Sequence, residues 1–328
     1  MYRLPRCLVY LLTLCVGLLP AGLSAGPAAA AGPARILEVR PLGGRQVEVV
    51  VHSAAMDKPI TLWMSHPGPG APALYLLNAV DGGEDGGPWM RRTDVVDFFA
   101  DKPVNVIVPM GGRASYYTDW IADDPVLGRN KWETFLAREL PPLLDDRFGM
   151  TGRNAVAGLS MSATSALNLA VHAPGLYRAV GAYSGCTRTS DPVARAIVYS
   201  QLALFGANAT NMWGAPGNPA WLDHDPMLHL DRLRGLALYV SAGNGAPGPY
   251  EAPQARGIDG DPLRLADRML VGGTMESVVN KCTGPLAAAL AAAQIPATVN
   301  FHPGTHAWAY WQDDLHRSWP VFAGALGV

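Results

Sequence analysis

Apolar and polar side chains alternate in two short segments, and this alternation predicts a pair of β-strands. Ile36–Arg40 and Gln46–His52 flank Gly43-Gly44, a dipeptide that favours a tight turn. Alternation of this kind lets one face of a strand contact the core while the other face meets solvent. We therefore expect a β-hairpin with antiparallel strands in this part of the chain.

Farther along, short apolar runs alternate with segments in which apolar residues recur at helical spacing. The short runs predict strands at Ile60–Met64, Ala73–Leu77, Val104–Pro109, Ala155–Ala157, Ala179–Tyr183, Leu236–Ser241 and Ala297–Phe301. The periodic segments predict helices at Asp94–Ala100, Lys131–Phe148, Met275–Ala293 and Trp308–Leu326. Pro141-Pro142 is expected to kink or interrupt the second of these helices, and Pro320 to bend the last. Strands that alternate with helices imply an α/β fold with a mostly parallel central sheet flanked by helices.

The first 31 residues differ in composition from the rest of the chain. Two arginines precede an apolar run, Cys7–Leu19, and small residues follow it. This order is typical of a secretory signal, and we expect residues 1–31 to be one, cleaved near Ala30 or Ala31, or after Ala25. The alternative is a retained anchor, which the shortness of the apolar run disfavours.

Residues 32–328 are long enough for a single large α/β domain with a substantial core. The formal net charge is −2, so composition gives no support for a nucleic-acid partner. Of the four cysteines, only Cys186 and Cys282 lie after the expected signal. An even number in an exported protein predicts a disulfide between them, the alternative being two buried free thiols.

The pentapeptide Gly158–Ser162 lies between a predicted strand and a helical pattern. A serine between small residues at a strand-to-helix turn is typical of the nucleophile elbow of serine hydrolases and acyltransferases. Ser160 would then project above the sheet, and the N–H of Met161 would lie at a helix start, where it can stabilise an oxyanion. The alternative is an ordinary connection that contains a serine by chance. The motif favours the α/β-hydrolase fold, with the Gly- and Pro-rich stretch Gly206–Pro226 as a loop over the catalytic face.

In that fold the acid and then the base follow the serine along the chain. Of eight histidines, His306 lies in a turn between the last predicted strand and the last predicted helix, where the base belongs. The alternative is a structural turn histidine. The acid is open, because a position after a strand favours Glu251, Asp259 or Asp261, and spacing alone does not separate these from Glu276.

Several further stretches have a distinctive sequence. They are Leu76-Leu77-Asn78, Tyr116-Tyr117-Thr118-Asp119-Trp120, Lys131-Trp132-Glu133-Thr134-Phe135-Leu136, Met212-Trp213-Gly214, Gly243-Asn244-Gly245, Gly304-Thr305-His306-Ala307-Trp308 and Tyr310-Trp311. Together with the pentapeptide they resemble the secreted mycolyltransferases of mycolic-acid-containing bacteria, the antigen 85 family. The resemblance covers essentially the whole chain after residue 31.

The resemblance implies a triad of Ser160, Glu276 and His306. In that family the acid is on a helix after the Gly-Asn-Gly loop and follows a bulky apolar residue, as Glu276 does here. The acid would orient the histidine and stabilise its imidazolium form. The family's second oxyanion N–H belongs to the loop after its Leu-Leu-Asp run, which is Leu76-Leu77-Asn78 here, so Val80 and Met161 are the expected pair of donors.

The resemblance also implies residues around a bound sugar. Asn78 and Asp81 occupy positions where better-known members use Asp and Arg, so different trehalose contacts are expected here. Trp308 matches the tryptophan that walls the sugar pocket, the alternative being core packing at a helix start. The run 82–85 and the Cys186/Cys282 pair resemble the family's shorter-chain, corynomycolate-type branch.

The implied reaction is acyl transfer through a serine acyl-enzyme. A mycoloyl group would move from trehalose monomycolate to a second trehalose monomycolate, giving trehalose dimycolate, or to cell-wall arabinan. Expected partners are therefore trehalose mycolates and arabinogalactan, in a secreted or cell-envelope protein with peripheral association with the outer mycolate layer. The sequence contains no metal-ligand spacing, phosphate loop or nucleotide fingerprint, so no metal or cofactor is expected. The alternatives are a secreted serine carboxylesterase and a non-catalytic carbohydrate- or matrix-binding member of the family.

Overall fold

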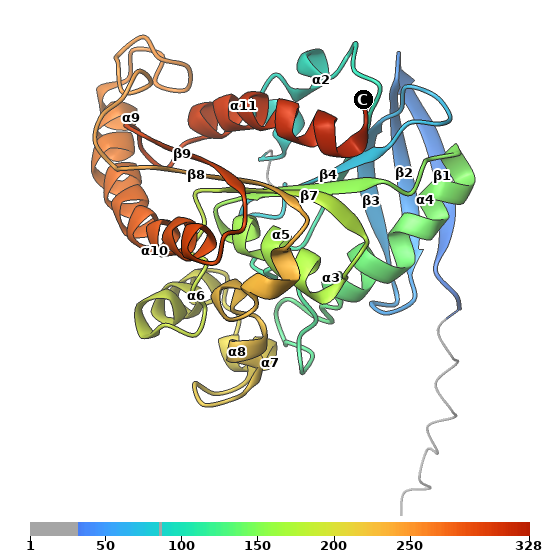
Figure 1. Ribbon diagram of the computed structural model, residues 1–328, viewed down its shortest axis with the longest axis horizontal. Coiled ribbons are helices and arrows are strands. Elements are labelled where there is room, and N and C mark those ends of the chain that lie inside the picture. The colour runs from blue at the N-terminus through green and yellow to red at the C-terminus, as the bar shows by residue number, and fades with distance from the viewer. Residues whose placement is uncertain (1–31, 85–86) are drawn as a thin grey trace, which may run out of the picture. The chain divides into compact units, whose positions relative to one another are not determined.

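A computed structural model describes residues 32–84 and 87–328 (Figure 1). The expected secretory signal, residues 1–31, and Asp85 of the run 82–85 lie outside the described residues. Within the described ranges, no helix is both long and apolar enough to cross a membrane.

In the described part of the chain, nine strands form a single sheet in the order β1-β2-β3-β5-β4-β6-β7-β8-β9. β1, β2, β3 and β5 pair antiparallel, and the sheet is parallel from β5 through β9. The hairpin and the mostly parallel sheet are confirmed. The strands are β1 (Arg35–Gly43), β2 (Gln46–Ser53), β3 (Lys58–Ser65), β4 (Ala73–Leu77), β5 (Asn105–Pro109), β6 (Asn154–Leu159), β7 (Tyr177–Tyr183), β8 (Ala237–Gly243) and β9 (Ala297–His302).

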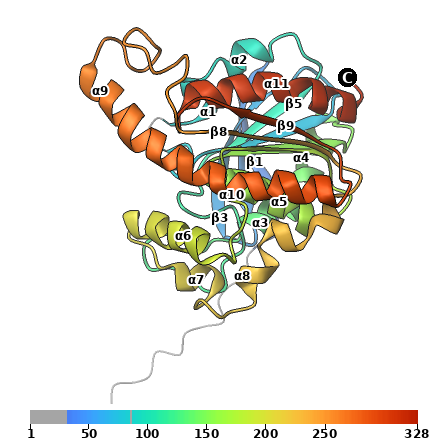
Figure 2. The ribbon, with the colours of Figure 1, turned by 60° about the vertical axis from the view of Figure 1, so that its left-hand side comes forward.

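Helices cover both faces of the sheet (Figures 1 and 2). Successive residues of a strand point to opposite faces, so a strand that is apolar throughout needs cover on both. In β4, Tyr75 and Leu77 pack into one buried cluster, and Leu74 and Leu76 pack into the other. Burial on both faces explains why the central strands are unbroken apolar runs. The first face is covered by α4 (Leu140–Phe148), α5 (Met161–His172) and α10 (Gly273–Ala292), and the second by α1 (Trp89–Arg92), α2 (Val95–Phe98) and α11 (Trp308–Leu326).

The predicted helix Lys131–Phe148 is divided into three parts. α3 (Trp132–Thr134) continues into a π-helical turn, η1 (Phe135–Glu139), and then into α4. The predicted interruption therefore falls just before the two prolines. They lie in the first turn of α4, where a missing backbone N–H costs little.

The prediction of a long loop at Gly206–Pro226 is wrong. Trp213 and Trp221 in this segment are buried, and their rings meet edge to face with centroids 5.1 Å apart. These two indoles belong to the main buried cluster, and their burial stabilises short helices despite the glycines and prolines around them. The segment and the residues after it contain α7 (Ala209–Trp213), α8 (Ala220–Asp223), η2 (Pro226–Leu228) and η3 (Leu230–Leu233).

The helices α6 (Pro192–Leu204) and α9 (Pro262–Asp267) are among those that were not predicted. Each follows an Asp-Pro step, in which the carboxylate of Asp191 or Asp261 accepts hydrogen bonds from two N–H groups of the first turn. An aspartate cap followed by proline is a helix start signal that would have located both helices. A π-helical turn, η4 (Arg268–Gly272), joins α9 to α10.

Candidate active site

Ser160 lies at the sharp turn between β6 and α5. Its φ of 52° is in the left-handed region, and its N–H donates to the carbonyl oxygen of Tyr183 at 2.8 Å. Gly158 is required because a Cβ at that position would lie 2.1 Å from the carbonyl oxygen of Ser162. The turn is strained and tightly packed, as a nucleophile elbow is.

Gly158→Ala is expected to lower the free energy of unfolding by about 2 kcal/mol or more, because the new methyl group overlaps the backbone of Ser162. Thermal and urea unfolding measure the change. Gly324→Ala is the control, since Gly324 is exposed on α11 and a Cβ there meets no atom within 4 Å. That variant is expected to gain about 0.5–1 kcal/mol. Equal effects of the two substitutions would contradict the packing of the turn.

Ser162, where the motif usually has glycine, connects the elbow to the neighbouring strand. Its Oγ accepts a hydrogen bond from Leu159 N–H at 2.9 Å and lies 3.2 Å from the carbonyl oxygen of Leu77. Leu77 is the last residue of β4 and pairs with Gly158 of β6. The hydroxyl therefore fixes the elbow against the start of the loop that follows β4.

The side chains of Ser160, His306 and Glu276 form a hydrogen-bonded line. His306 Nε2 lies 2.8 Å from Ser160 Oγ, and His306 Nδ1 lies 2.5 Å from Glu276 Oε2. The serine comes from the elbow, the histidine from the turn between β9 and α11, and the glutamate from α10. The structure thus brings together the three residues expected to form a triad. With Nδ1–H donated to the carboxylate, Nε2 faces the hydroxyl as an acceptor.

The Glu276 carboxylate is buried, with 1% of the residue exposed, and its other oxygen is also bonded. Oε1 accepts from the hydroxyl of Ser184 at 2.7 Å and from the N–H of Gly243 at 2.6 Å. These donors fix the orientation in which the carboxylate meets His306. Sequence reasoning did not find Ser184, because its position after β7 carries no motif.

The other candidate acids are engaged elsewhere. Glu251 accepts hydrogen bonds from Thr305 Oγ1 at 2.7 Å, from Gly248 N–H at 2.7 Å and from the hydroxyl of Tyr310. It therefore holds the turn that carries His306, from outside the line of three side chains. Two further candidates, Asp259 and Asp261, pair with Arg264 beside α9.

Val80 and Met161 follow two strands that lie side by side, β4 and β6. The carbonyl oxygen of Val80 accepts from the N–H of Ala114 at 2.8 Å, which fixes the loop. No hydrogen bond between described residues uses the N–H of Val80 or of Met161. Their predicted role as the pair of oxyanion donors stays a prediction.

Asn78 holds the same loop from inside the protein. Its side chain is fully buried, and Nδ2 donates to the carbonyl oxygen of Pro109 at 2.8 Å and to that of Gly82 at 3.4 Å. Its backbone N–H donates to the hydroxyl of Tyr117, which in turn donates to the carbonyl oxygen of Gly111. The NH₂ group is thus used within the fold, whereas Oδ1 has no hydrogen-bond partner among the described residues, and the expected sugar contact at Asn78 stays a prediction.

Asp81 and Trp308 are more open to a ligand. Asp81 accepts from the N–H of Gly83 at 3.0 Å, and burial raises the pKa of its carboxyl although that N–H and the charge of Arg92 act in the opposite direction. Trp308, at the start of α11, meets Trp89 edge to face with centroids 5.4 Å apart and also lines a cavity. Trp308 therefore both packs against a neighbouring indole and lines a cavity.

Two cavities of about 590 Å³ each meet at His306. The first is apolar, and Ser160 and Met161 form part of its wall. Helix α6 and the segment from η4 into α10 supply most of the rest of this wall, and Gly206–Pro226 contributes none of its lining residues. The aliphatic lining residues are Ala194, Ile197, Val198, Leu204, Leu270, Val271, Met275, Val278 and Val279.

The second cavity has a more polar lining than the first. Trp308 and two acidic residues, Asp259 and Asp267, contribute to its lining. Its arginines come from α1 and from the segment between β8 and α10, and they are Arg91, Arg92, Arg256, Arg264 and Arg268. An apolar cavity and an arginine-rich cavity therefore share His306, Val271 and Met275 as lining residues.

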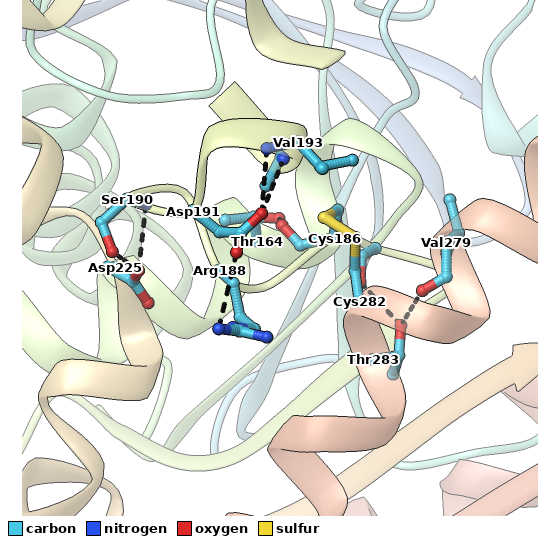
Figure 3. Close-up of a disulfide and its surroundings, with 12 residues drawn as sticks. Thr164, Cys186, Arg188, Ser190, Asp191, Val193, Asp225, Val279, Cys282 and Thr283 are labelled. Carbon is cyan, nitrogen blue, oxygen red and sulfur yellow. Dashed lines mark hydrogen bonds and ion pairs between the residues drawn. A yellow bond between two sulfur atoms is a disulfide. The ribbon is translucent and has the colours of Figure 1, made fainter. Parts of the chain in front are cut away.

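Cys186 and Cys282 form the predicted disulfide (Figure 3). The bond joins the segment after β7 to α10, the helix that carries Glu276. Thr164 of α5 donates to the carbonyl oxygen of Cys186 at 2.9 Å, so the bridge is also connected to the elbow helix. It therefore links the elements that position the serine and the acid.

The sheet is mostly parallel, and a strained serine follows β6. A histidine–carboxylate pair is hydrogen-bonded to that serine. These features are typical of serine hydrolases with the α/β-hydrolase fold. The model of the family described as "Putative esterase" matches residues 53–321. Within that class the chain belongs to the antigen 85 family of mycolyltransferases, as its curated relatives show.

Two such relatives cover most of the chain. "Diacylglycerol acyltransferase/mycolyltransferase Ag85B" of Mycobacterium avium is 32% identical over 85% of this chain and 82% of its own length. Ag85A of Mycobacterium bovis, with the same descriptive name, is 30% identical over 96% of this chain and 92% of its own length. The family resemblance in the sequence is confirmed.

Solved structures agree with the fold. Mycobacterium tuberculosis MPT51 (FbpC1) superposes with a TM-score of 0.67 at 25% identity, covering 84% of this chain and 96% of its own. FphF, a fluorophosphonate-binding serine hydrolase of Staphylococcus aureus, has a TM-score of 0.59 at 16% identity, covering 88% and 99%. The second likeness concerns the fold alone.

Proposed function

We propose that this protein transfers a mycoloyl group from trehalose monomycolate to a second trehalose monomycolate, giving trehalose dimycolate, or to cell-wall arabinan. The observation that carries the proposal is the meeting of an apolar and a polar chamber at His306, beside Ser160. Such an arrangement suits an ester between a long acyl chain and a sugar. The names of the relatives, acyltransferase and mycolyltransferase, support the same chemistry.

In the first step His306 takes the proton of Ser160, whose oxygen attacks the ester carbonyl of the donor. The N–H groups of Val80 and Met161 stabilise the negative charge on the carbonyl oxygen of the tetrahedral intermediate. Glu276 holds the imidazole in the required orientation and stabilises the imidazolium ion. His306 then gives its proton to the departing trehalose oxygen, and the acyl group remains on Ser160.

In the second step a hydroxyl group of the acceptor replaces trehalose in the polar cavity. His306 removes its proton as the oxygen attacks the acyl-enzyme, and the new ester leaves with Ser160 restored. Transfer prevails over hydrolysis when the acceptor is held in place and water is excluded. Arginine N–H groups and the Asp81 carboxylate are suited to hydroxyl groups of a sugar, and Trp308 offers an indole face to the ring.

The site of action follows from the same reasoning. The segment 1–31 has the composition of a secretory signal, and the proposed substrates belong to the outer envelope of the cell. We propose a secreted or envelope-associated protein that contacts the mycolate layer peripherally, with trehalose mycolates and arabinogalactan as partners.

The test follows the products formed when the purified mature protein meets trehalose monomycolate, with Ser160→Ala as the control. Trehalose dimycolate with free trehalose, absent in the control, is the expected result. Free mycolic acid as the sole product would make the protein a carboxylesterase. Absence of any product that depends on Ser160 would favour a binding protein.

The apolar cavity is expected to set the preference for acyl chains. Ile197→Trp places an indole in this cavity and should lower kcat/KM for long-chain donors by about 10-fold or more, with a smaller effect on a short-chain ester. Val193→Trp, on the same helix but 61% exposed, is the control and should leave both activities near the wild-type values. Steady-state rates with donors of graded chain length check this, and an equal loss for short and long chains would contradict it.

A further inference from the structure

Among the described residues, one carboxylate and two imidazoles converge at a place separate from the candidate active site. They belong to Glu133 of α3, His172 at the end of α5 and His224 directly after α8. His172 Nδ1 lies 3.0 Å from Glu133 Oε2, and His224 Nε2 lies 3.7 Å from the same oxygen. One nitrogen or oxygen atom of each residue lies within 4.8 Å of the other two.

The second nitrogen of each imidazole is tied to a backbone carbonyl oxygen. His172 Nε2 lies 3.0 Å from the oxygen of Asp223, and His224 Nδ1 lies 2.8 Å from that of Ala220. A carbonyl oxygen only accepts, so these two nitrogens carry the hydrogens. A neutral ring then directs the lone pair of its other nitrogen toward Glu133. Histidines that bind metals have this arrangement, in which the N–H away from the metal is held by a carbonyl or carboxylate.

Three acceptor atoms thus face one another, and a positive charge is needed between them. One divalent cation provides that charge at a single point. With metal–ligand bonds of about 2.0–2.2 Å, tetrahedral geometry separates neighbouring ligand atoms by roughly 3.4 Å. The two separations from Glu133 Oε2, 3.0 and 3.7 Å, lie on either side of this value.

The surroundings fix the rings and leave room for further ligands. The imidazole of His224 stacks on the indole of Trp213 with centroids 4.7 Å apart, and it stands perpendicular to the ring of His172. A cavity of about 360 Å³ opens beside the cluster and is also lined by Asp223 and His229. Water or one of these side chains can therefore complete a coordination shell.

We propose that Glu133, His172 and His224 bind one divalent transition-metal ion, with Zn²⁺ best matched to two imidazoles and one carboxylate. The ion would join α3, α5 and the segment around α8. The 12 residues of α5 separate this site from Ser160 by about 18 Å along the helix axis, so its role is to stabilise the fold rather than to assist the chemistry.

The experiment uses the full mature protein without a polyhistidine tag, stripped of metal by a chelator. Zn²⁺ is titrated by calorimetry, thermal unfolding is measured with and without Zn²⁺, and Co²⁺ absorption reports nitrogen coordination. The expected result is one ion per chain and a rise in Tm on its addition. Glu133→Gln and His224→Gln should each weaken binding at least 10-fold, whereas the control His316→Gln, at a histidine of α11 paired with Asp94, should bind normally.

Glu133→Gln keeps the shape of the side chain, so it serves as the test if the histidine variant does not fold. A wild-type protein that binds neither ion would overturn the proposal and indicate that protons supply the charge in the cluster. Binding that is unchanged in Glu133→Gln would overturn it equally, since the ion would then lie elsewhere.

Discussion

Replacing Glu276 by glutamine lowers kcat for acyl transfer by about 10⁴-fold while the protein remains folded. The side-chain oxygen of the glutamine takes the place of Oε1, because Ser184 and Gly243 both donate there. Its NH₂ group then faces His306 Nδ1 and donates to it. The imidazole is left in the tautomer that carries its hydrogen on Nε2, and that nitrogen cannot accept the proton of Ser160.

Steady-state kinetics with trehalose monomycolate measure the loss, and thermal unfolding checks the fold. Asp261→Asn is the matched control, since Asp261 was a candidate acid from the sequence but caps α9 and pairs with Arg264. Asparagine caps a helix about as well as aspartate, so this variant should retain near wild-type activity. A comparable loss in both variants would remove Glu276 from the proposed role.

Removing the disulfide has the largest expected effect on stability. The bond closes a loop with a sequence separation of 96 residues, and Cys186→Ala with Cys282→Ala should cost about 2–4 kcal/mol. Tm should fall by roughly 5–10 °C. Activity should fall as well, because Cys282 shares α10 with Glu276 and both contribute to the position of the acid.

Urea unfolding of the wild-type and double-variant proteins, each with and without a reducing agent, measures this effect. Reduction should lower the stability of the wild-type protein to that of the variant and leave the variant unchanged. A wild-type protein that loses no stability on reduction would contradict a structural role for the bond. If the reducing agent also destabilised the variant, the loss of stability in the wild-type protein could not be assigned to cleavage of this bond.

The sheet could be predicted because parallel strands buried on both faces are continuous apolar runs, as in β4 and β6. The serine and the histidine could also be found, one from the packing demands of its turn and the other from its place after the last strand. The acid could not be found from spacing, because Glu276 reaches His306 only when α10 packs beside β8. The family resemblance, not the local pattern, distinguished it from Glu251.

Other parts of the site depend on contacts between distant segments and leave no local pattern. The hydrogen bond from Asn78 Nδ2 to the carbonyl oxygen of Pro109 is one such contact, because Pro109 lies on β5, a strand that pairs with β4. The cluster of Glu133, His172 and His224 has no metal-ligand spacing in the sequence, since its members come from three separate elements. The prediction of a loop at Gly206–Pro226 failed for a different reason. Buried indoles stabilise short helices there despite the glycines and prolines.

The placement of the acid on α10 has a consequence for how this protein can diverge. In the simplest arrangement the acid lies in the connection after a strand, so insertions or deletions there would displace it. Here the acid lies on α10, outside the connection between β8 and α10. Residues of that connection between Arg256 and Val271 line the second, arginine-rich cavity. Glu251 in the same connection holds the turn of His306, so we expect only changes within residues 256–271 to alter acceptor choice while the acid keeps its anchorage on Ser184 and Gly243. Residues 256–271 are thus the segment in which substitutions are expected to change acceptor specificity.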